Sequence, residues 1–190
     1  MNPRLTLVLL FALFLAPILV AVLLNSRWVE WEPAPERSHG ELIEPVVPLP
    51  AFELATADGG SVAREDLLER WTLLQVEPGP CAVDCQERAY LLRQVRAAQN
   101  RHVPDIDLLL ITGDAPDATL GARIRELDPV FDVVGGPDAA PLRAVIPGAE
   151  TGGFYIVDPQ GNIMERFGLE TDPTGIRKDL RRLLTWTVRE

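Results

Sequence analysis

The chain is predicted to fold as an α/β domain, with a mixed central sheet flanked by helices, behind an N-terminal transmembrane helix. Two patterns in its 190 residues predict this arrangement. From residue 51 onward, short apolar runs that fit strands alternate with longer stretches in which apolar residues recur every three or four positions, as in amphipathic helices. Before residue 51, a continuously apolar segment gives way to one rich in proline and charge, which indicates an anchor and a linker.

Residues 1–25 have the composition of a membrane anchor. The run from Leu5 to Leu24 carries no charged side chain, and Thr6 is its only polar residue. About 20 apolar residues are enough for a helix to cross the hydrocarbon core. The alternative is a cleaved signal peptide, but the segment Val22 to Asn25 is a poor cleavage site. We therefore expect an uncleaved, single-pass anchor.

The charges beside this segment predict its orientation. Arg4 and the terminal amine precede it, whereas Arg27 on the other side is followed by Glu30 and Glu32. This slight basic bias places the N-terminus in the cytoplasm. The C-terminal domain would then face the periplasm from the inner (cytoplasmic) membrane of a Gram-negative bacterium. That compartment tolerates disulfides.

Residues 26–50 fit a linker, and residues 51–190 the folded domain. The linker carries the prolines Pro33, Pro35, Pro45, Pro48 and Pro50 among several charges, a composition typical of an extended, semi-rigid spacer. The residues after the anchor include 17 basic and 28 acidic side chains, a net charge of −11. This balance argues against nucleic acid or anionic lipid as the partner.

The first half of the domain is predicted to contain a hairpin, a short helix, a central strand and a long helix. Alternating apolar residues around a Gly-rich turn predict the hairpin between Phe52 and Val62. A short helix is expected over residues 64–70. The apolar run Trp71 to Val76 fits a strand buried on both faces. The long helix, from Gln86 to Asn100, is expected to bury Ala89, Leu91, Leu92, Val95 and Ala98.

The second half continues the alternation of strands and helices. We expect strands over residues 107–112, 131–134, 154–157 and 163–167, and helices over 117–127, 138–145 and 172–187. The turn residues 158–162 make the last two strands antiparallel. The closing helix is amphipathic, with Ile176, Leu180, Leu183 and Leu184 facing inward.

The only two cysteines, Cys81 and Cys85, lie where the central strand turns into the long helix. Side chains four positions apart on a first helical turn share one face, so two thiols there can close a disulfide or bind one soft metal ion. The free N–H groups of the turn and the helix dipole favour a thiolate. Two ordinary buried cysteines, or a static staple, are the less favoured alternatives, because a redox or metal motif needs this strand–turn–helix context.

With this order of elements, the chain resembles a thioredoxin-like domain and, among these, the Sco/SenC family. These are membrane-anchored proteins that assemble the copper site of cytochrome c oxidase. The resemblance covers the anchor and the chain from about Phe52 onward. Three motifs carry it, namely Phe52-Glu53-Leu54 with Asp58-Gly59-Gly60, the CxxxC pair, and the late segment Phe154 to Gly161. It implies a thioredoxin-like fold, redox or copper chemistry at the cysteines, and a protein partner such as an oxidase copper-site subunit or a copper chaperone.

The chain is a divergent member by this resemblance, because it lacks the histidine that binds copper in the family. That histidine lies eight residues before the acidic or glycine residue of the late hairpin turn, and here the position is Glu150. A carboxylate is a poor ligand for soft Cu(I). The two histidines, His39 and His102, lie in the linker and beyond the long helix. In addition, Thr151-Gly152-Gly153 stands where other thioredoxin-like enzymes carry a cis-proline.

Three functions remain open from the sequence. The first is thiol–disulfide exchange during oxidase maturation, with Cys81 as the attacking thiolate and Cys85 as the resolving thiol. The second is a copper(I) carrier that uses Cys81 and Cys85, with a third ligand from Glu150, a partner or water. The third is a non-catalytic, membrane-tethered assembly or docking factor. We favour the first because the copper-ligand histidine is missing.

Overall fold

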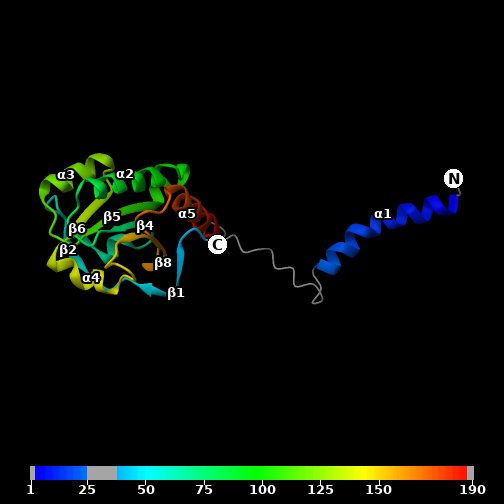
Figure 1. Ribbon diagram of the computed structural model, residues 1–190, viewed down its shortest axis with the longest axis horizontal. Helices are drawn as coiled ribbons and strands as arrows, with labels where there is room; N and C mark the ends of the chain where they lie inside the picture. The colour runs from blue at the N-terminus through cyan, green and yellow to red at the C-terminus, as the bar shows by residue number, and fades with distance from the viewer. Residues whose placement is uncertain (1–2, 25–37, 188–190) are drawn as a thin grey trace. The chain divides into compact units, whose positions relative to one another are not determined.

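A computed structural model describes residues 3–24 and 38–187 (Figure 1). The chain divides into two units, Met1–Arg37 and Ser38–Glu190. In the first unit, α1 (Pro3–Leu24) is helical over the whole apolar run from Leu5 to Leu24. Within the described ranges, no helix qualifies by length and hydropathy as a membrane span, so membrane anchoring stays a prediction.

The second unit is built on a six-stranded mixed sheet in the order β1-β8-β7-β4-β5-β6. The strands are β1 (Glu41–Pro48), β4 (Trp71–Val76), β5 (Ile106–Thr112), β6 (Phe131–Gly135), β7 (Gly153–Val157) and β8 (Asn162–Phe167). Strands β4, β5 and β6 run parallel, whereas β7 is antiparallel to both β4 and β8. The mixed sheet predicted from the sequence is therefore confirmed.

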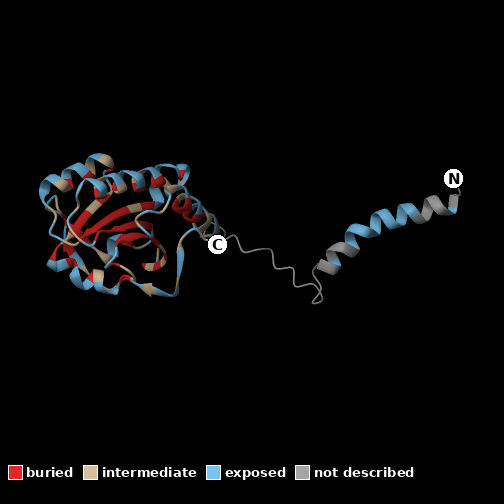
Figure 2. Ribbon diagram, viewed as in Figure 1, coloured by how far each residue is buried: buried red, intermediate tan, exposed pale blue. Residues whose placement is uncertain are grey.

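Helices cover both faces of this sheet (Figures 1 and 2). The elements outside the sheet are the hairpin β2 (Glu53–Ala55) and β3 (Ser61–Ala63), the helices α2 (Val83–Ala97), α3 (Ala118–Leu127), α4 (Ala140–Val145) and α5 (Pro173–Thr187), and the 3-10 turns η1 (Arg64–Leu67), η2 (Asn100–Asp105) and η3 (Pro137–Ala139). Buried residues of α2, α3 and α5 pack on one face of the sheet. The hairpin, η1 and α4 pack on the other. All six residues of β4 are buried between these layers, as expected of its continuous apolar run.

The predicted linker is wrong in its second half, because Glu41–Pro48 forms the edge strand β1. It pairs antiparallel with β8, with an irregular register between Leu42 and Val47. Proline is tolerated in an edge strand because one side of that strand needs no ladder hydrogen bonds. The compact unit accordingly begins at Ser38, not at residue 51. Residues 25–37 of the anchor and linker prediction lie outside the described residues.

The long helix also differs from the prediction in its start and its buried face. It begins at Val83, so Cys85 belongs to its first turn. Its buried residues are Cys85, Ala89, Leu92, Val95 and Arg96. Leu91 is 38% exposed, and Ala98 is exposed as well. Three of the predicted residues are therefore buried, and Cys85 and Arg96 complete the buried face in place of Leu91 and Ala98.

Candidate functional site

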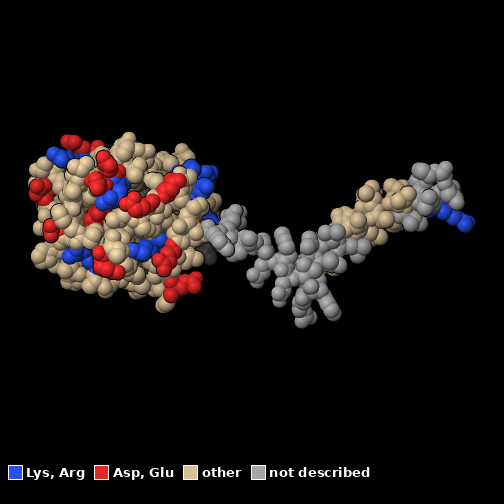
Figure 3. Space-filling model, viewed as in Figure 1, with Lys and Arg blue, Asp and Glu red and all other residues tan. Residues whose placement is uncertain are grey.

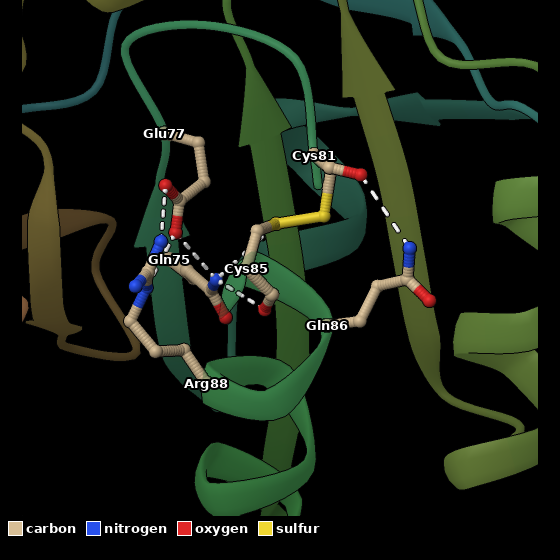
Figure 4. Close-up of polar contacts among 6 residues, drawn as sticks. All are labelled: Gln75, Glu77, Cys81, Cys85, Gln86 and Arg88. Atoms are coloured by element: carbon tan, nitrogen blue, oxygen red, sulfur yellow. Dashed lines mark hydrogen bonds and ion pairs between the residues drawn. A yellow bond between two sulfur atoms is a disulfide. The ribbon is translucent and has the colours of Figure 1, made fainter. Parts of the chain in front are cut away.

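The site is the turn between β4 and α2, where Cys81 and Cys85 form a disulfide (Figure 4). Their Cα atoms lie 5.1 Å apart, within the usual range for such a bond. Cys81 precedes the helix and is partly exposed, whereas Cys85 lies in its first turn and is 1% exposed. Only one of the two sulfur-bearing residues is therefore open to a partner.

Two glycines hold the loop that leads to Cys81. A Cβ at Gly113, just after β5, would overlap the carbonyl oxygen of Pro78, and the Gly113 N–H donates to Gly79 O at 2.9 Å. On the other side, a Cβ at Gly152 would lie 2.8 Å from Val76 O and 3.0 Å from Pro78 Cδ. Because neither glycine has a side chain, the backbone of β5 and the loop before β7 can both approach the cysteine loop.

The loop before β7 is itself fixed by Arg166 of β8. One guanidinium nitrogen of Arg166 donates to Thr151 Oγ1 at 2.7 Å and lies 3.4 Å from the carbonyl oxygens of Gly148 and Gly152. Among the described residues the only cis peptide bond is Glu44–Pro45, so the peptides of Thr151-Gly152-Gly153 are trans. The loop that stands in place of the cis-proline of other thioredoxin-like enzymes therefore packs, through Gly152, against the start of the cysteine loop.

Behind the disulfide lies a buried polar network that the sequence analysis missed. The amide nitrogen of Gln75 in β4 donates to Glu77 Oε1 at 2.8 Å and to the carbonyl oxygen of Cys85 at 3.1 Å. The same nitrogen lies 3.7 Å from Cys85 Sγ. Arg88 of α2 donates to both oxygens of Glu77, at 3.0 and 2.9 Å. These hydrogen bonds with Glu77 raise the pKa of Arg88.

This network changes the expected electrostatics of the site. From the sequence alone, Glu77 counts as a negative charge that disfavours a nearby thiolate. In the structure Arg88 neutralises that charge, and the Gln75 amide lies between Glu77 and Cys85 (Figure 4). The one signal in the sequence was Gln75 itself, an amide side chain inside a mostly apolar central strand.

A cleft of about 340 Å³ opens beside Cys81, between α2 and the connection from β5 to α3. Gln86, Asp114 and Arg123 line it together with Cys81. The Gln86 amide lies at 3.5 Å from the carbonyl oxygen of Cys81. On the face of the molecule drawn in Figure 3, acidic and basic side chains are interspersed over the domain. Cys81 can therefore be reached from this cleft.

The residues of this site do not fit a three-ligand copper centre. While the disulfide is closed the two sulfurs cannot bind Cu(I), which takes thiolates, so only the reduced pair could supply two ligands. In the part of the chain that the structure describes, no three His, Cys, Asp or Glu side chains cluster as metal ligands would. His39 Nδ1 lies 3.1 Å from Asp179 Oδ1, His102 lies beside Asp105, and Glu150 is exposed.

The fold and the disulfide define the class of protein. A mixed sheet with a cysteine pair at the junction of a central parallel strand and the following helix makes this a thioredoxin-like protein. The family model described as "Transmembrane-like, thioredoxin-like, C-terminal domain" matches residues 71–187. The chain belongs to this family.

Solved structures of Sco proteins share the fold. Copper-bound yeast Sco1 superposes with a TM-score of 0.61 at 15% identity, over 74% of this chain and 94% of that one. Copper-bound ScoI of Bradyrhizobium japonicum gives a TM-score of 0.56 at 20% identity, over 72% and 98%. The resemblance to Sco/SenC proteins is thus confirmed at the level of the fold.

A short stretch of the chain is also similar to a curated protein of known sequence. A probable phospholipid hydroperoxide glutathione peroxidase of Citrus sinensis is 35% identical over 74 residues, which cover 33% of this chain. The match spans 44% of that protein, less than half of its length. A match this short leaves the activity to be inferred from the site.

Proposed function

We propose that this protein is a thiol–disulfide oxidoreductase that acts through Cys81 and Cys85 on a partner protein. The observation that carries the proposal is the asymmetry of the disulfide. Cys81 is partly exposed beside a cleft, whereas Cys85 is buried behind it. An exposed attacking sulfur with a buried resolving sulfur is the arrangement that thiol–disulfide exchange needs, because a partner can reach only one of them.

The exchange begins from the dithiol form of the chain. The Cys81 thiolate attacks one sulfur of the partner's disulfide, and the other partner sulfur leaves as a thiolate. The Cys85 thiolate then attacks Cys81 Sγ and releases the partner's second sulfur as a thiolate. The partner has gained two electrons and is a dithiol, and the chain holds the disulfide seen in the structure. A dithiol donor protein must restore the chain by the reverse steps.

The proposed partner is a copper-site subunit of cytochrome c oxidase or a copper chaperone, whose paired cysteines must be reduced before they bind copper. The structural likeness to Sco proteins supports this choice, and so does the resemblance of the motifs. We further propose that residues 1–25 anchor the chain in the inner membrane with the domain in the periplasm. The uncharged run and the compartment's tolerance of disulfides support this placement.

Trapping of mixed disulfides tests the roles of the two cysteines. In membranes from cells that express Cys85→Ser, we expect a mixed disulfide between Cys81 and the partner, because no resolving thiol remains. Cys81→Ser should trap much less, since Cys85 is buried. Non-reducing gels show both results. Equal trapping by the two variants would overturn the assignment of Cys81 as the attacking residue.

The same variants, together with a copper measurement on the purified protein, distinguish the two other functions. If neither variant traps a partner and oxidase assembles normally when both cysteines are serine, the chain is a non-catalytic docking factor. A copper(I) carrier that uses the two cysteines would instead retain copper after purification under reducing conditions. The copper-bound Sco structures favour this second candidate. The absence of a fitting third ligand among the described residues ranks it below thiol–disulfide exchange.

A further inference from the structure

Among the described residues, Gln75 is the one polar side chain within hydrogen-bond distance of Cys85 Sγ, the buried sulfur of the disulfide. It is fully buried in β4, at 0% exposure, between Leu110 of β5 and Phe154 of β7. Its amide nitrogen lies 3.7 Å from Cys85 Sγ. A buried amide in a strand packed on both faces is normally explained by its hydrogen bonds, so its partners indicate its role.

The orientation of the Gln75 amide follows from its neighbours. Its nitrogen faces two acceptors, Glu77 Oε1 at 2.8 Å and the carbonyl oxygen of Cys85 at 3.1 Å. The flipped amide would place its oxygen against both, which is repulsive. One N–H is therefore committed to Glu77, and the other points to the first turn of α2, where it is shared between the carbonyl oxygen and the sulfur of Cys85.

The acceptors of that second N–H change when the disulfide opens. In the disulfide, Cys85 Sγ is neutral and a weak acceptor, so the carbonyl oxygen takes the hydrogen bond. When a thiolate attacks Cys81 Sγ, the S–S bond breaks and its electron pair leaves on Cys85 Sγ. A charged sulfur is a much stronger acceptor than a neutral one. It is buried, so water cannot stabilise it, and Gln75 is the side chain placed to do so.

The ion pair behind Gln75 keeps its amide in place. Both oxygens of Glu77 are bound by Arg88, so Glu77 stays a fixed, charge-compensated acceptor for one Gln75 N–H. This bond prevents the amide from turning away from the sulfur. The side-chain oxygen of Gln75, Oε1, is buried and has no hydrogen-bond partner. The position is therefore not optimised for stability, since such a group costs free energy in the folded state.

We propose that Gln75 is a catalytic residue of the disulfide, which donates its side-chain N–H to the Cys85 thiolate as that sulfur leaves or attacks, and that Glu77 and Arg88 are positioning residues that hold the Gln75 amide. This inference rests on the proposed function, because it assigns a role within thiol–disulfide exchange. The Gln75 amide would stabilise the thiolate of Cys85 in addition to the helix dipole.

The test compares the rates at which dithiothreitol reduces the disulfide in the full-length wild type, Gln75→Met and Gln99→Met. Methionine keeps the length of glutamine and removes its N–H groups. Gln99 is a matched control, since its buried amide donates to the carbonyl oxygens of Val95 and Arg177, far along the chain from the cysteines. We expect Gln75→Met to be reduced about tenfold more slowly than the wild type, because a poorer leaving thiolate slows exchange. Gln99→Met should match the wild type.

Equal rates for Gln75→Met and Gln99→Met would overturn the role of Gln75, even if both variants lose stability. A measurement on the wild type stands beside this comparison in case Gln75→Met does not fold. The side-chain amide proton of Gln75 should move downfield in NMR spectra when the disulfide is reduced at alkaline pH. An unchanged signal would overturn the proposal. If instead the wild-type disulfide resists dithiothreitol in the folded state, the proposed function itself is wrong.

Discussion

Arg88 binds both carboxylate oxygens of Glu77, at 3.0 and 2.9 Å, and Gln75 links this pair to Cys85. The side chain of Glu77 is 5% exposed and that of Arg88 is 20% exposed, so the pair is largely shielded from water. A buried pair of this kind adds little net stability compared with apolar residues, but the loss of one partner leaves an uncompensated charge. Glu77 directly follows β4 and Arg88 lies in α2, so the pair ties the start of the cysteine loop to the helix.

Arg88→Met should destabilise the protein by about 3 kcal/mol, because Glu77 would remain buried without its counter-charge. The double variant Glu77→Gln with Arg88→Met should recover most of this loss, since no unpaired charge remains. Urea unfolding of the two variants and the wild type measures the difference. Arg93→Met, on the same helix, removes only a bond to the carbonyl oxygen of Leu127 and should cost about 1 kcal/mol. Equal losses for Arg88→Met and Arg93→Met would contradict this account.

A second buried acid makes stability depend on pH. Glu165 in β8 is 1% exposed, and burial, followed by the charge of Asp179, raises its pKa to about 7. Neither side-chain oxygen of Glu165 accepts a hydrogen bond. A protonated Glu165 can instead donate a hydrogen bond to Asp179. Burial alone would raise the pKa of Asp179, yet hydrogen bonds from His39 and Gly40 hold it below its usual value.

We expect stability to fall as pH rises from about 4.5 to 7, because the folded chain keeps the Glu165 proton that the unfolded chain has lost. Over this window the penalty reaches about 3 kcal/mol. Asp179 acts in the opposite sense, since its lowered pKa stabilises the fold above pH 4 and that contribution is lost at lower pH. In urea unfolding, Glu165→Gln should make the free energy of unfolding nearly independent of pH between pH 5 and 8. The exposed control Glu170→Gln should leave it unchanged, and a flat wild-type curve would contradict the prediction.

The glycine beside the cysteine loop gives a third prediction. Gly152 has a φ of +75°, and a Cβ there would press on Val76 O and Pro78 Cδ. Gly152→Ala should therefore destabilise the protein by about 2 kcal/mol, from backbone strain and the displaced loop. Thermal unfolding measures the loss. Gly79→Ala is the matched control, because no atom lies within 4 Å of its added Cβ. Comparable losses for the two variants would show that the loop before β7 does not press on the cysteine loop.

The middle of the sheet could be predicted from the sequence because β4, β5 and β7 are almost wholly buried. The run Trp71–Val76 became β4 with its predicted bounds, and the late hairpin pairs β7 with β8 as expected. The edge strand β1 was missed for the opposite reason. Most of its residues are exposed, and Pro45 and Pro48 give it the composition of a spacer. Only its pairing with β8 makes it a strand, and a local pattern does not show that pairing.

The candidate site divides in the same way. The cysteine pair and its turn are local features, and their disulfide is confirmed. The roles of Cys81 and Cys85 in exchange stay a prediction. The contacts around the disulfide were beyond sequence reasoning, because Glu77 meets Arg88 across eleven positions and depends on how α2 is rotated against β4. The approach of Gly113 and Gly152 to Pro78 likewise joins three separate parts of the chain.

The last prediction concerns copper and the missing histidine. Glu150 is exposed in the loop before β7 and lines a cleft with Pro78 of the cysteine loop. With two thiolates and no imidazole, the reduced wild type should lose Cu(I) to a strong chelator. Glu150→His should bind Cu(I) at least about tenfold more tightly than the wild type. Loss of a residue that only hydrogen-bonds to a metal ligand already changes metal affinity by about 10- to 100-fold, and a new ligand should have no smaller effect. Chelator competition under reducing conditions measures both.

Ala144→His adds a histidine to the same cleft as a control and should not change the affinity. If the wild type retains stoichiometric copper and Glu150→His changes nothing, position 150 does not correspond to the family's histidine, and the copper carrier becomes the better account of this protein.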